Sequence, residues 1–338
     1  MPDLTTEVAG VALRNPLVAS ACGLTRSLDF VVALAEAGIG AVTTKTISVY
    51  PLGGTETLYL ESDYQTIAAD PRLLLDDGVK LIKEAKKRVD VPIIANIIGH
   101  SDHVQEWTQV AQAVEAAGAD IVEVDLNCHT PDKPGPPDKW RRFGDQGSVG
   151  ADPDLTRAVL EIVRAAVDVP VSTKICPSTM DLLGQAQAAL DGGSDALSLL
   201  NATDGLPGLD IYNGGRSLYP GLETLHANAL VGDPANPFAL YMTAVFGVAF
   251  DGTPMISGGG VMKWERAVER LMAGAKAVGM AALLYRDGPE AIPTMLKGIE
   301  SYMEDQGYEN LAAIPRADRD SIRVVDWWKH PSHETTPA

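Results

Sequence analysis

The chain has 338 residues, of which 46% are hydrophobic, and its formal net charge is −18 because 45 Asp and Glu outnumber 27 Lys and Arg. This length and apolar content allow one large folded core, whereas the negative charge disfavours nucleic acid and anionic membranes as partners. The N-terminal segment Met1–Glu7 has no basic stretch followed by an apolar one, and no run of about 18 apolar residues occurs. We therefore expect a cytoplasmic protein that does not span a membrane.

In chain order, the first predicted element is a short hairpin in which Ala9-Gly10 joins Thr5–Val8 to Val11–Leu13. Short apolar runs then alternate with longer stretches that have a period of about 3.6 residues, and the short runs predict buried strands. The eight predicted strands are Leu17–Ser20, Ala41–Thr44, Ile93–Ile97, Ile121–Asp125, Val171–Lys174, Ala196–Leu200, Met255–Ser257 and Ala277–Met280.

The longer periodic stretches predict helices between and after these strands. They are Leu28–Ala37, Asp76–Val89, His103–Ala117, Pro153–Val167, Met180–Asp191, Pro237–Phe250, Trp264–Ala273 and Pro289–Gln306. Strict alternation of strand and helix predicts a parallel sheet, and eight such units match a closed (β/α)8 TIM barrel of the α/β class. An open doubly wound sheet is the alternative, but Ala21-Cys22-Gly23-Leu24 follows the first strand in place of its usual GxGxxG.

We expect a single barrel domain over residues 1–338, with its core at about 15–308 and a polar tail at 326–338. In such a barrel the hairpin would close the bottom, which is the N-terminal end of the strands. Three stretches without periodicity follow strand ends: Tyr50–Ser62, His129–Gly150 and Ala202–Gly221. Barrel enzymes carry their binding loops there, so these stretches predict long βα loops at the C-terminal face.

The only three cysteines are Cys22, Cys128 and Cys176, which are too far apart for a CxxC redox or zinc pattern. We expect reduced thiols, no metal site, and no standard iron–sulfur cluster held by this chain alone, because such a cluster usually needs four cysteines. Cys22 and Cys176 are interpreted as structural.

Cys128 is different, because it follows the predicted fourth strand and opens a long loop at the barrel mouth. A free thiol has a pKa of about 8.5, so it can exchange a proton near neutral pH. The residues Asp125-Leu126-Asn127-Cys128 resemble the start of the Asn-Leu-Ser-Cys-Pro motif of class 1 dihydroorotate dehydrogenases. A buried structural cysteine is the alternative interpretation.

The resemblance to this family, and to the flavin domain of dihydropyrimidine dehydrogenase, continues in order from about Asn15 to Tyr308. It implies an FMN-dependent oxidoreductase that acts on a CH–CH bond of dihydroorotate or a related dihydropyrimidine-like cyclic amide. In the implied mechanism, Cys128 is the general acid/base and flavin N5 is the hydride carrier.

Two lysines, Lys45 and Lys174, stand at predicted strand ends where a barrel would bury apolar residues. A buried ammonium group is costly unless an anion or a carbonyl-rich ligand meets it. The N1–C2 carbonyl edge of a reduced flavin is anionic, and the resemblance assigns Lys174 to that edge and Lys45 to both flavin and substrate. A salt bridge to a neighbouring barrel carboxylate is the alternative for each lysine.

Glycines follow the seventh predicted strand, at Gly258-Gly259-Gly260, and another, Gly279, stands near the end of the eighth. They allow backbone N–H groups to approach a phosphate, which indicates a phosphate-bearing ligand without distinguishing FMN from a sugar phosphate. The resemblance implies FMN. The residues implied for the cofactor are Ala19, Ser20, Gly23, Lys45, Asn96, Lys174, Asn201, Gly258, Gly259, Gly260, Gly279 and Met280.

The family's pyrimidine-binding asparagines are only partly present. The residues implied for the substrate are Asp125, Asn127, Thr130, Asn201 and Thr203, and of these Asp125 and Thr130 stand where the family has Asn. An ionised Asp125 accepts hydrogen bonds but donates none. We therefore predict a modified pyrimidine or another unsaturated cyclic amide with an extra N–H or amino group opposite Asp125. The alternative is that Asp125 pairs with Lys174 or another cation.

Two other function classes stay open. One is a non-flavin, phosphate-binding barrel lyase or isomerase, which would be colourless when purified. The other is a flavin-bound subunit without turnover of its own. The resemblance also implies a homodimer and allows a separate electron-transfer partner, but the sequence does not identify the electron acceptor.

Overall fold

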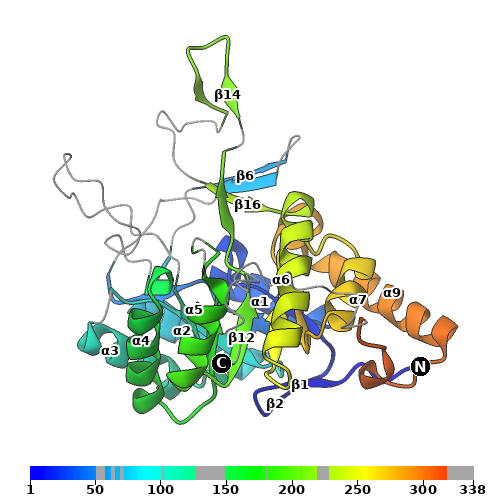
Figure 1. Ribbon diagram of the computed structural model, residues 1–338, viewed down its shortest axis with the longest axis horizontal. Coiled ribbons are helices and arrows are strands. Elements are labelled where there is room, and N and C mark those ends of the chain that lie inside the picture. Colours follow the sequence, from blue (N-terminus) through cyan, green and yellow to red (C-terminus); the bar gives the residue numbers. More distant parts are fainter. Residues whose placement is uncertain are drawn as a thin grey trace, which may run out of the picture.

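The protein is described by a computed structural model (Figure 1). The described residues are 1–50, 58–61, 65–68, 72–100, 103–126, 149–177, 179, 181–206, 208–218 and 228–317.

Eight parallel strands close into a barrel. Their order is β10-β11-β12-β17-β18-β3-β4-β9, and β9 pairs with β10 to complete the ring. This closure confirms the predicted TIM barrel and excludes the open sheet. The barrel strands are β3 (Leu17–Ala19), β4 (Ala41–Thr43), β9 (Ile93–Ile97), β10 (Ile121–Asp125), β11 (Val171–Lys174), β12 (Ala196–Leu199), β17 (Met255–Ser257) and β18 (Ala277–Met280).

Helices surround the barrel (Figure 1). Side-chain caps start several of them, as where Asp152 accepts hydrogen bonds from the backbone N–H groups of Asp154 and Leu155 at the start of α4. All predicted helices are confirmed, whereas the short α8 was missed. The helices are α1 (Leu28–Glu36), α2 (Leu75–Arg88), α3 (Val104–Ala116), α4 (Pro153–Ala166), α5 (Leu182–Asp191), α6 (Asn236–Ala249), α7 (Trp264–Met272), α8 (Ala282–Asp287) and α9 (Ala291–Gln306). Among the described residues, none of these helices has the length and apolar content needed to cross a bilayer.

The predicted hairpin is present as β1 (Thr6–Val8) and β2 (Val11–Leu13), which pair antiparallel. Its turn has positive φ at Ala9 (50°) and at Gly10 (83°), the backbone conformation of a tight two-residue turn. Val8 and Leu13 are buried in the same cluster as the lowest inward-facing side chains of the barrel. The hairpin therefore closes the bottom of the barrel, as predicted.

The opposite end carries strands that were not predicted. Four of them form an antiparallel sheet in the order β13-β16-β7-β6, and two others form a hairpin that projects above it (Figure 1). Four of these six strands fall in the segments Tyr50–Ser62 and Ala202–Gly221, which had been predicted as long loops. The additional strands are β5 (Ile47–Ser48), β6 (Leu58–Glu61), β7 (Gln65–Ala68), β8 (Leu73–Leu74), β13 (Thr203–Gly205), β14 (Leu209–Asp210), β15 (Arg216–Ser217) and β16 (Asn228–Val231).

Candidate active site

The interior of the barrel changes from apolar to charged along the strands. Successive side chains of a strand point to opposite faces, so every second residue points inward. The layer nearest the hairpin is apolar and consists of Val18, Ala41, Ile94, Ile121, Ala196, Ile256 and Ala277. Two residues further along these strands stand polar side chains and glycines, and the charged residues follow at the C-terminal ends. The polar end is therefore the candidate site.

Glu123 lies at the centre of the polar layer and is 4% exposed. Its Oε1 accepts a hydrogen bond of 2.7 Å from Nδ2 of Asn96 on the neighbouring strand β9, and its Oε2 accepts one from the hydroxyl of Ser198. The Ser198 hydroxyl also lies 3.1 Å from that of Ser172. Four strands are thus linked by one network, which the sequence analysis missed. A glutamate inside the apolar run Ile121–Asp125 was the signal that could have shown it.

Asn96 has a second feature that bears on ligand binding. Its side chain is fully buried, and its Oδ1 has no hydrogen-bond partner among the described residues. A buried carbonyl oxygen without a donor is unfavourable by about 1–3 kcal/mol, and such groups are uncommon in folded proteins. This acceptor is therefore suited to a ligand N–H group.

The charged layer above contains Asp125, Lys174 and Lys45. The Nζ of Lys174 lies 3.7 Å from Oδ2 of Asp125, and the side chains are 13% and 1% exposed. Nδ2 of Asn201 donates a 2.8 Å hydrogen bond to Oδ1 of the same carboxylate. The pairing that the sequence left as an alternative for Asp125 and Lys174 is therefore present. Lys45 is buried at the same end, at 5% exposure.

Glycines occupy the other side of the mouth. A Cβ atom at Gly279 would stand 2.5 Å from Oγ of Ser20, so the backbone there is bare and closely packed. Gly260 has φ +80°, and a Cβ atom on it would lie 2.5 Å from the backbone nitrogen of Asn236. Only glycine meets both conditions at position 260. Gly260 and Gly279 are buried and Gly259 is partly buried, so this side of the mouth is built of closely packed backbone without side chains.

The remaining predicted residues fall in different places. Ala19 and Met280 belong to the buried cluster between barrel and helices, so only their backbone can face the interior. Gly23 is buried at the start of a 3-10 helix over Gly23–Arg26. Thr203 lies on β13, and its side chain is exposed. The predicted residues Asn127, Cys128 and Thr130 lie outside the described residues. Cys22 and Cys176 are buried, in agreement with the structural interpretation.

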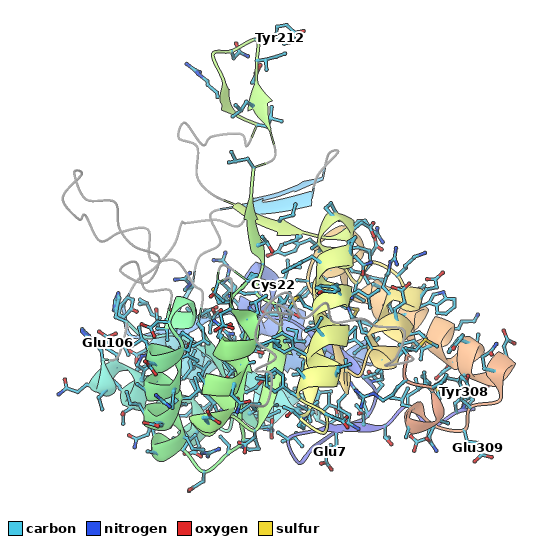
Figure 2. All side chains as sticks on the ribbon, in the orientation of Figure 1. Glu7, Cys22, Glu106, Tyr212, Tyr308 and Glu309 are labelled. Atoms are coloured by element: carbon cyan, nitrogen blue, oxygen red, sulfur yellow. The ribbon has the colours of Figure 1, made fainter. Side chains whose placement is uncertain are left out.

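A histidine–glutamate cluster stands where β9 leads into α3. The Oε2 of Glu106 lies 3.0 Å from Nδ1 of His100 and accepts a 2.9 Å hydrogen bond from its backbone N–H, while Oε1 lies 3.2 Å from Nδ1 of His103. The ring of Tyr50 stacks on that of His100 at a centroid distance of 3.7 Å. Burial raises the pKa of Glu106, but these hydrogen bonds lower it more, so the pKa lies below its usual value. The cluster joins His100, just after β9, to the first turn of α3, and Glu106 itself is at the edge of the barrel (Figure 2).

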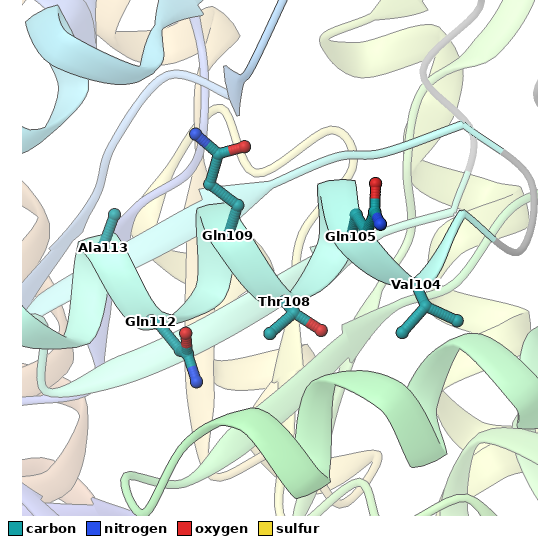
Figure 3. A pocket seen from close by; sticks show the side chains of 6 residues that line it. All are labelled: Val104, Gln105, Thr108, Gln109, Gln112 and Ala113. Carbon is teal, nitrogen blue, oxygen red and sulfur yellow. The ribbon is translucent and has the colours of Figure 1, made fainter.

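A shallow hollow also follows α3, lined by Val104, Gln105, Thr108, Gln109, Gln112 and Ala113 (Figure 3). All six residues belong to this one helix, and none is an inward-facing barrel residue. The hollow is therefore not part of the mouth.

A closed parallel barrel with charged residues at the C-terminal ends of its strands defines a (β/α)8-barrel enzyme. The family model described as dihydroorotate dehydrogenase matches residues 3–303 of the chain. The chain therefore belongs to the dihydroorotate dehydrogenase family, which confirms the resemblance and the predicted activity class, an oxidoreductase that acts on a CH–CH bond.

Similar sequences and a similar solved structure agree with this family membership. The chain is 32% identical over 311 residues to the "dihydroorotate dehydrogenase B (NAD(+)), catalytic subunit" of Methanothermobacter thermautotrophicus, covering 91% of this chain and 96% of that protein. A protein of the same name from Geotalea uraniireducens is 30% identical over 329 residues, covering 93% and 97%. The crystal structure of a ligand-free type dihydroorotate dehydrogenase from Eimeria tenella matches with a TM-score of 0.74 and covers 95% of this chain and 92% of that one. At 18% identity it shows the shared fold.

Proposed function

We propose that the protein is an FMN-dependent oxidoreductase of dihydroorotate or a related dihydropyrimidine-like cyclic amide. The observation that carries this proposal is the mouth itself, where the buried Lys45, the partly buried Lys174 and a carboxylate share the C-terminal end of the barrel with glycine positions, above an interior with an amide oxygen that has no partner among the described residues. A flat ligand with a phosphate at one end and an imide at the other matches these groups.

The residues present fit FMN. Lys174 and Lys45 supply positive charge for the anionic edge of the reduced ring, Oδ1 of Asn96 supplies an acceptor for an N–H group, and the turn at Gly259-Gly260 supplies backbone donors for the phosphate. Gly279 leaves room for the ring to pass. When bound, FMN supplies the hydride acceptor of the reaction.

The chain's own residues bind the substrate and handle its proton. Asn201 and Asp125 stand at the charged end, where their hydrogen bond fixes the amide of Asn201. The carboxylate of Asp125 accepts only, so it favours a ring that presents an N–H or amino group. Cys128 remains our predicted general acid/base, because a proton must be removed from the carbon beside the one that loses the hydride.

The test is anaerobic reduction of the purified yellow protein, followed by loss of its visible flavin absorption. We expect bleaching by dihydroorotate or by a dihydropyrimidine or related lactam that carries an extra N–H or amino group. Colourless protein that takes up no FMN would refute the cofactor. Bound FMN that dithionite reduces but that no dihydropyrimidine reduces, and that no matching pyrimidine reoxidises, would favour a subunit without turnover.

We further propose that the protein works as a cytoplasmic assembly, as a homodimer and with a separate electron-transfer subunit. The names of the relatives, which call them catalytic subunits, support the electron-transfer subunit. The apolar side chains of the projecting hairpin support an assembly in general, because Ile211 is 77% exposed and Tyr212, at its tip, is 91% exposed (Figure 2). Sedimentation of the chain alone tests the homodimer, for which the expected mass is twice that of the chain.

A further inference from the structure

Arg270 is a buried cation that the family resemblance did not assign. It belongs to α7, its side chain is 0% exposed, and the described residues offer it no carboxylate within salt-bridge distance. Burial lowers its pKa to about 10, so the guanidinium is still charged at neutral pH. A fully buried charge that no carboxylate contacts is costly, so the burial of Arg270 needs an explanation.

The contacts of Arg270 lead to the glycine turn. Its Nη2 donates a 2.7 Å hydrogen bond to the carbonyl oxygen of Gly259 and a 3.0 Å hydrogen bond to Oδ1 of Asn236, and it lies 3.4 Å from the carbonyl oxygen of Asn236. Asn236 begins α6, which lies beside α7 (Figure 1). The Nε and Nη1 atoms of Arg270 are buried and have no acceptor among the described residues. One guanidinium therefore ties the turn to two helices and still has unused donors.

The hydrogen bond to Gly259 also fixes the direction of the next N–H group. In a trans peptide the C=O and the following N–H point in opposite directions. Since the carbonyl of Gly259 points toward Arg270, the N–H of Gly260 points away from the α6–α7 side. Within the described part of the chain, neither the N–H of Gly259 nor that of Gly260 has an acceptor. Both remain available for an anion at the mouth.

We propose that Arg270 is a positioning residue for the phosphate end of the flavin site. It holds the Gly259–Gly260 peptide with its N–H toward the phosphate, and its buried positive charge is balanced by that phosphate when the ligand is bound. This inference rests on the proposed function and makes it more specific, because it predicts that Arg270 selects FMN over riboflavin, the same ring without the phosphate.

The experiment titrates flavin-free protein with FMN and, separately, with riboflavin, and follows the quenching of flavin fluorescence. In Arg270→Met we expect the Kd for FMN to rise about 10- to 100-fold, as for loss of a charge-assisted hydrogen bond, and the Kd for riboflavin to change by less than about threefold. Arg270→Lys keeps the charge but not the planar set of donors, so its FMN affinity should fall between those of the wild type and Arg270→Met.

The matched control is Arg266→Met, one turn earlier on α7, where the guanidinium pairs with Glu269 at 3.0 Å and the side chain is 30% exposed. It should leave both affinities unchanged. An equal rise of both Kd values in Arg270→Met would show a general structural role and overturn the proposal, as would unchanged FMN binding. If Arg270→Met does not fold, a folded Arg270→Lys with the full wild-type preference for FMN would overturn it as well. Wild-type protein that binds neither flavin would refute the proposed function itself, whereas wild-type protein that binds both flavins equally would refute only the role of Arg270.

Discussion

The buried network around Glu123 allows one prediction to be worked out atom by atom. In Glu123→Gln, the remaining side-chain oxygen can still accept from Nδ2 of Asn96. The new NH2 group then faces the hydroxyl of Ser198, which can accept this bond and turn its own hydrogen to Ser172, 3.1 Å away. Only the charge is lost, so we expect the free energy of unfolding to fall by about 1 kcal/mol.

Glu123→Leu cannot be accommodated in this way. It leaves Nδ2 of Asn96 buried without an acceptor, in a side chain whose Oδ1 already has no partner among the described residues. An unsatisfied buried donor costs about 1–3 kcal/mol, and the lost hydrogen bonds to a charged group add to it. We expect a total loss of about 3 kcal/mol or more. Since Glu123→Leu removes the hydrogen bond that Nδ2 of Asn96 donates, the amide group of Asn96 can rotate. FMN binding should therefore weaken in Glu123→Leu and stay near wild type in Glu123→Gln.

Urea denaturation followed by circular dichroism measures the stability change, and flavin titration measures the second effect. Glu161→Gln, on the exposed face of α4, is the control and should stay within about 0.5 kcal/mol of wild type. The reasoning fails if Glu123→Gln is as destabilising as Glu123→Leu, because the serine pair would then not adapt. It fails equally if Glu123→Leu costs less than about 1 kcal/mol.

Three further predictions concern the mouth and its edge. Asp125→Asn removes the counter-charge of Lys174 and should lower the free energy of unfolding by about 2 kcal/mol. The kcat/KM for unmodified dihydroorotate should rise relative to that for the modified ring, and an unchanged preference would contradict the proposed substrate contact. Gly260→Ala places a methyl group 2.5 Å from the backbone nitrogen of Asn236, at φ +80°. Urea denaturation should show a loss of about 2–4 kcal/mol in the free energy of unfolding. The control Gly214→Ala, at φ +69° in open space, should lose only about 1 kcal/mol. The pKa of Glu106 is lowered below its ordinary 4.5, so the ionised carboxylate stabilises the fold above that pH, and this stabilisation is lost as the pH falls through the folded-state pKa. The difference in unfolding free energy between wild type and Glu106→Gln should therefore narrow in acid. A difference that does not depend on pH would refute this prediction.

The barrel strands could be predicted because each is a local pattern. Ile93–Ile97, for example, is a short apolar run after a proline, and the structure reproduces its bounds. The antiparallel sheet above the barrel has no such signal, because its strands are short and its two halves are joined over a long distance in the sequence, where Ile67 pairs with Ala229. That pairing depends on a partner far along the chain, which a local pattern does not contain.

The site was predictable where a charge interrupts an apolar strand. Lys174 was found in this way, although its distance to Asp125 required the register of two neighbouring strands. Arg270 was missed because a charged residue on an amphipathic helix normally faces water. Arg266 and Arg270 stand four residues apart on α7, yet the side chain of Arg266 is 30% exposed whereas Arg270 is 0% exposed. Only the packing of α6 against α7 decides which of the two is buried.

Two unsatisfied groups point to the same ligand without any help from the family comparison. Asn96 and Arg270 are each fully buried, and each has hydrogen-bonding atoms without a partner in the described part of the chain. One offers an acceptor beneath the mouth, and the other a positive charge behind the glycine turn at its side. Because proteins rarely leave buried polar groups unpaired, the two needs are best met together, by a molecule with N–H donors at one end and an anion at the other. Riboflavin meets only the first need, whereas FMN meets both, and this difference is why the comparison of the two flavins is the decisive measurement.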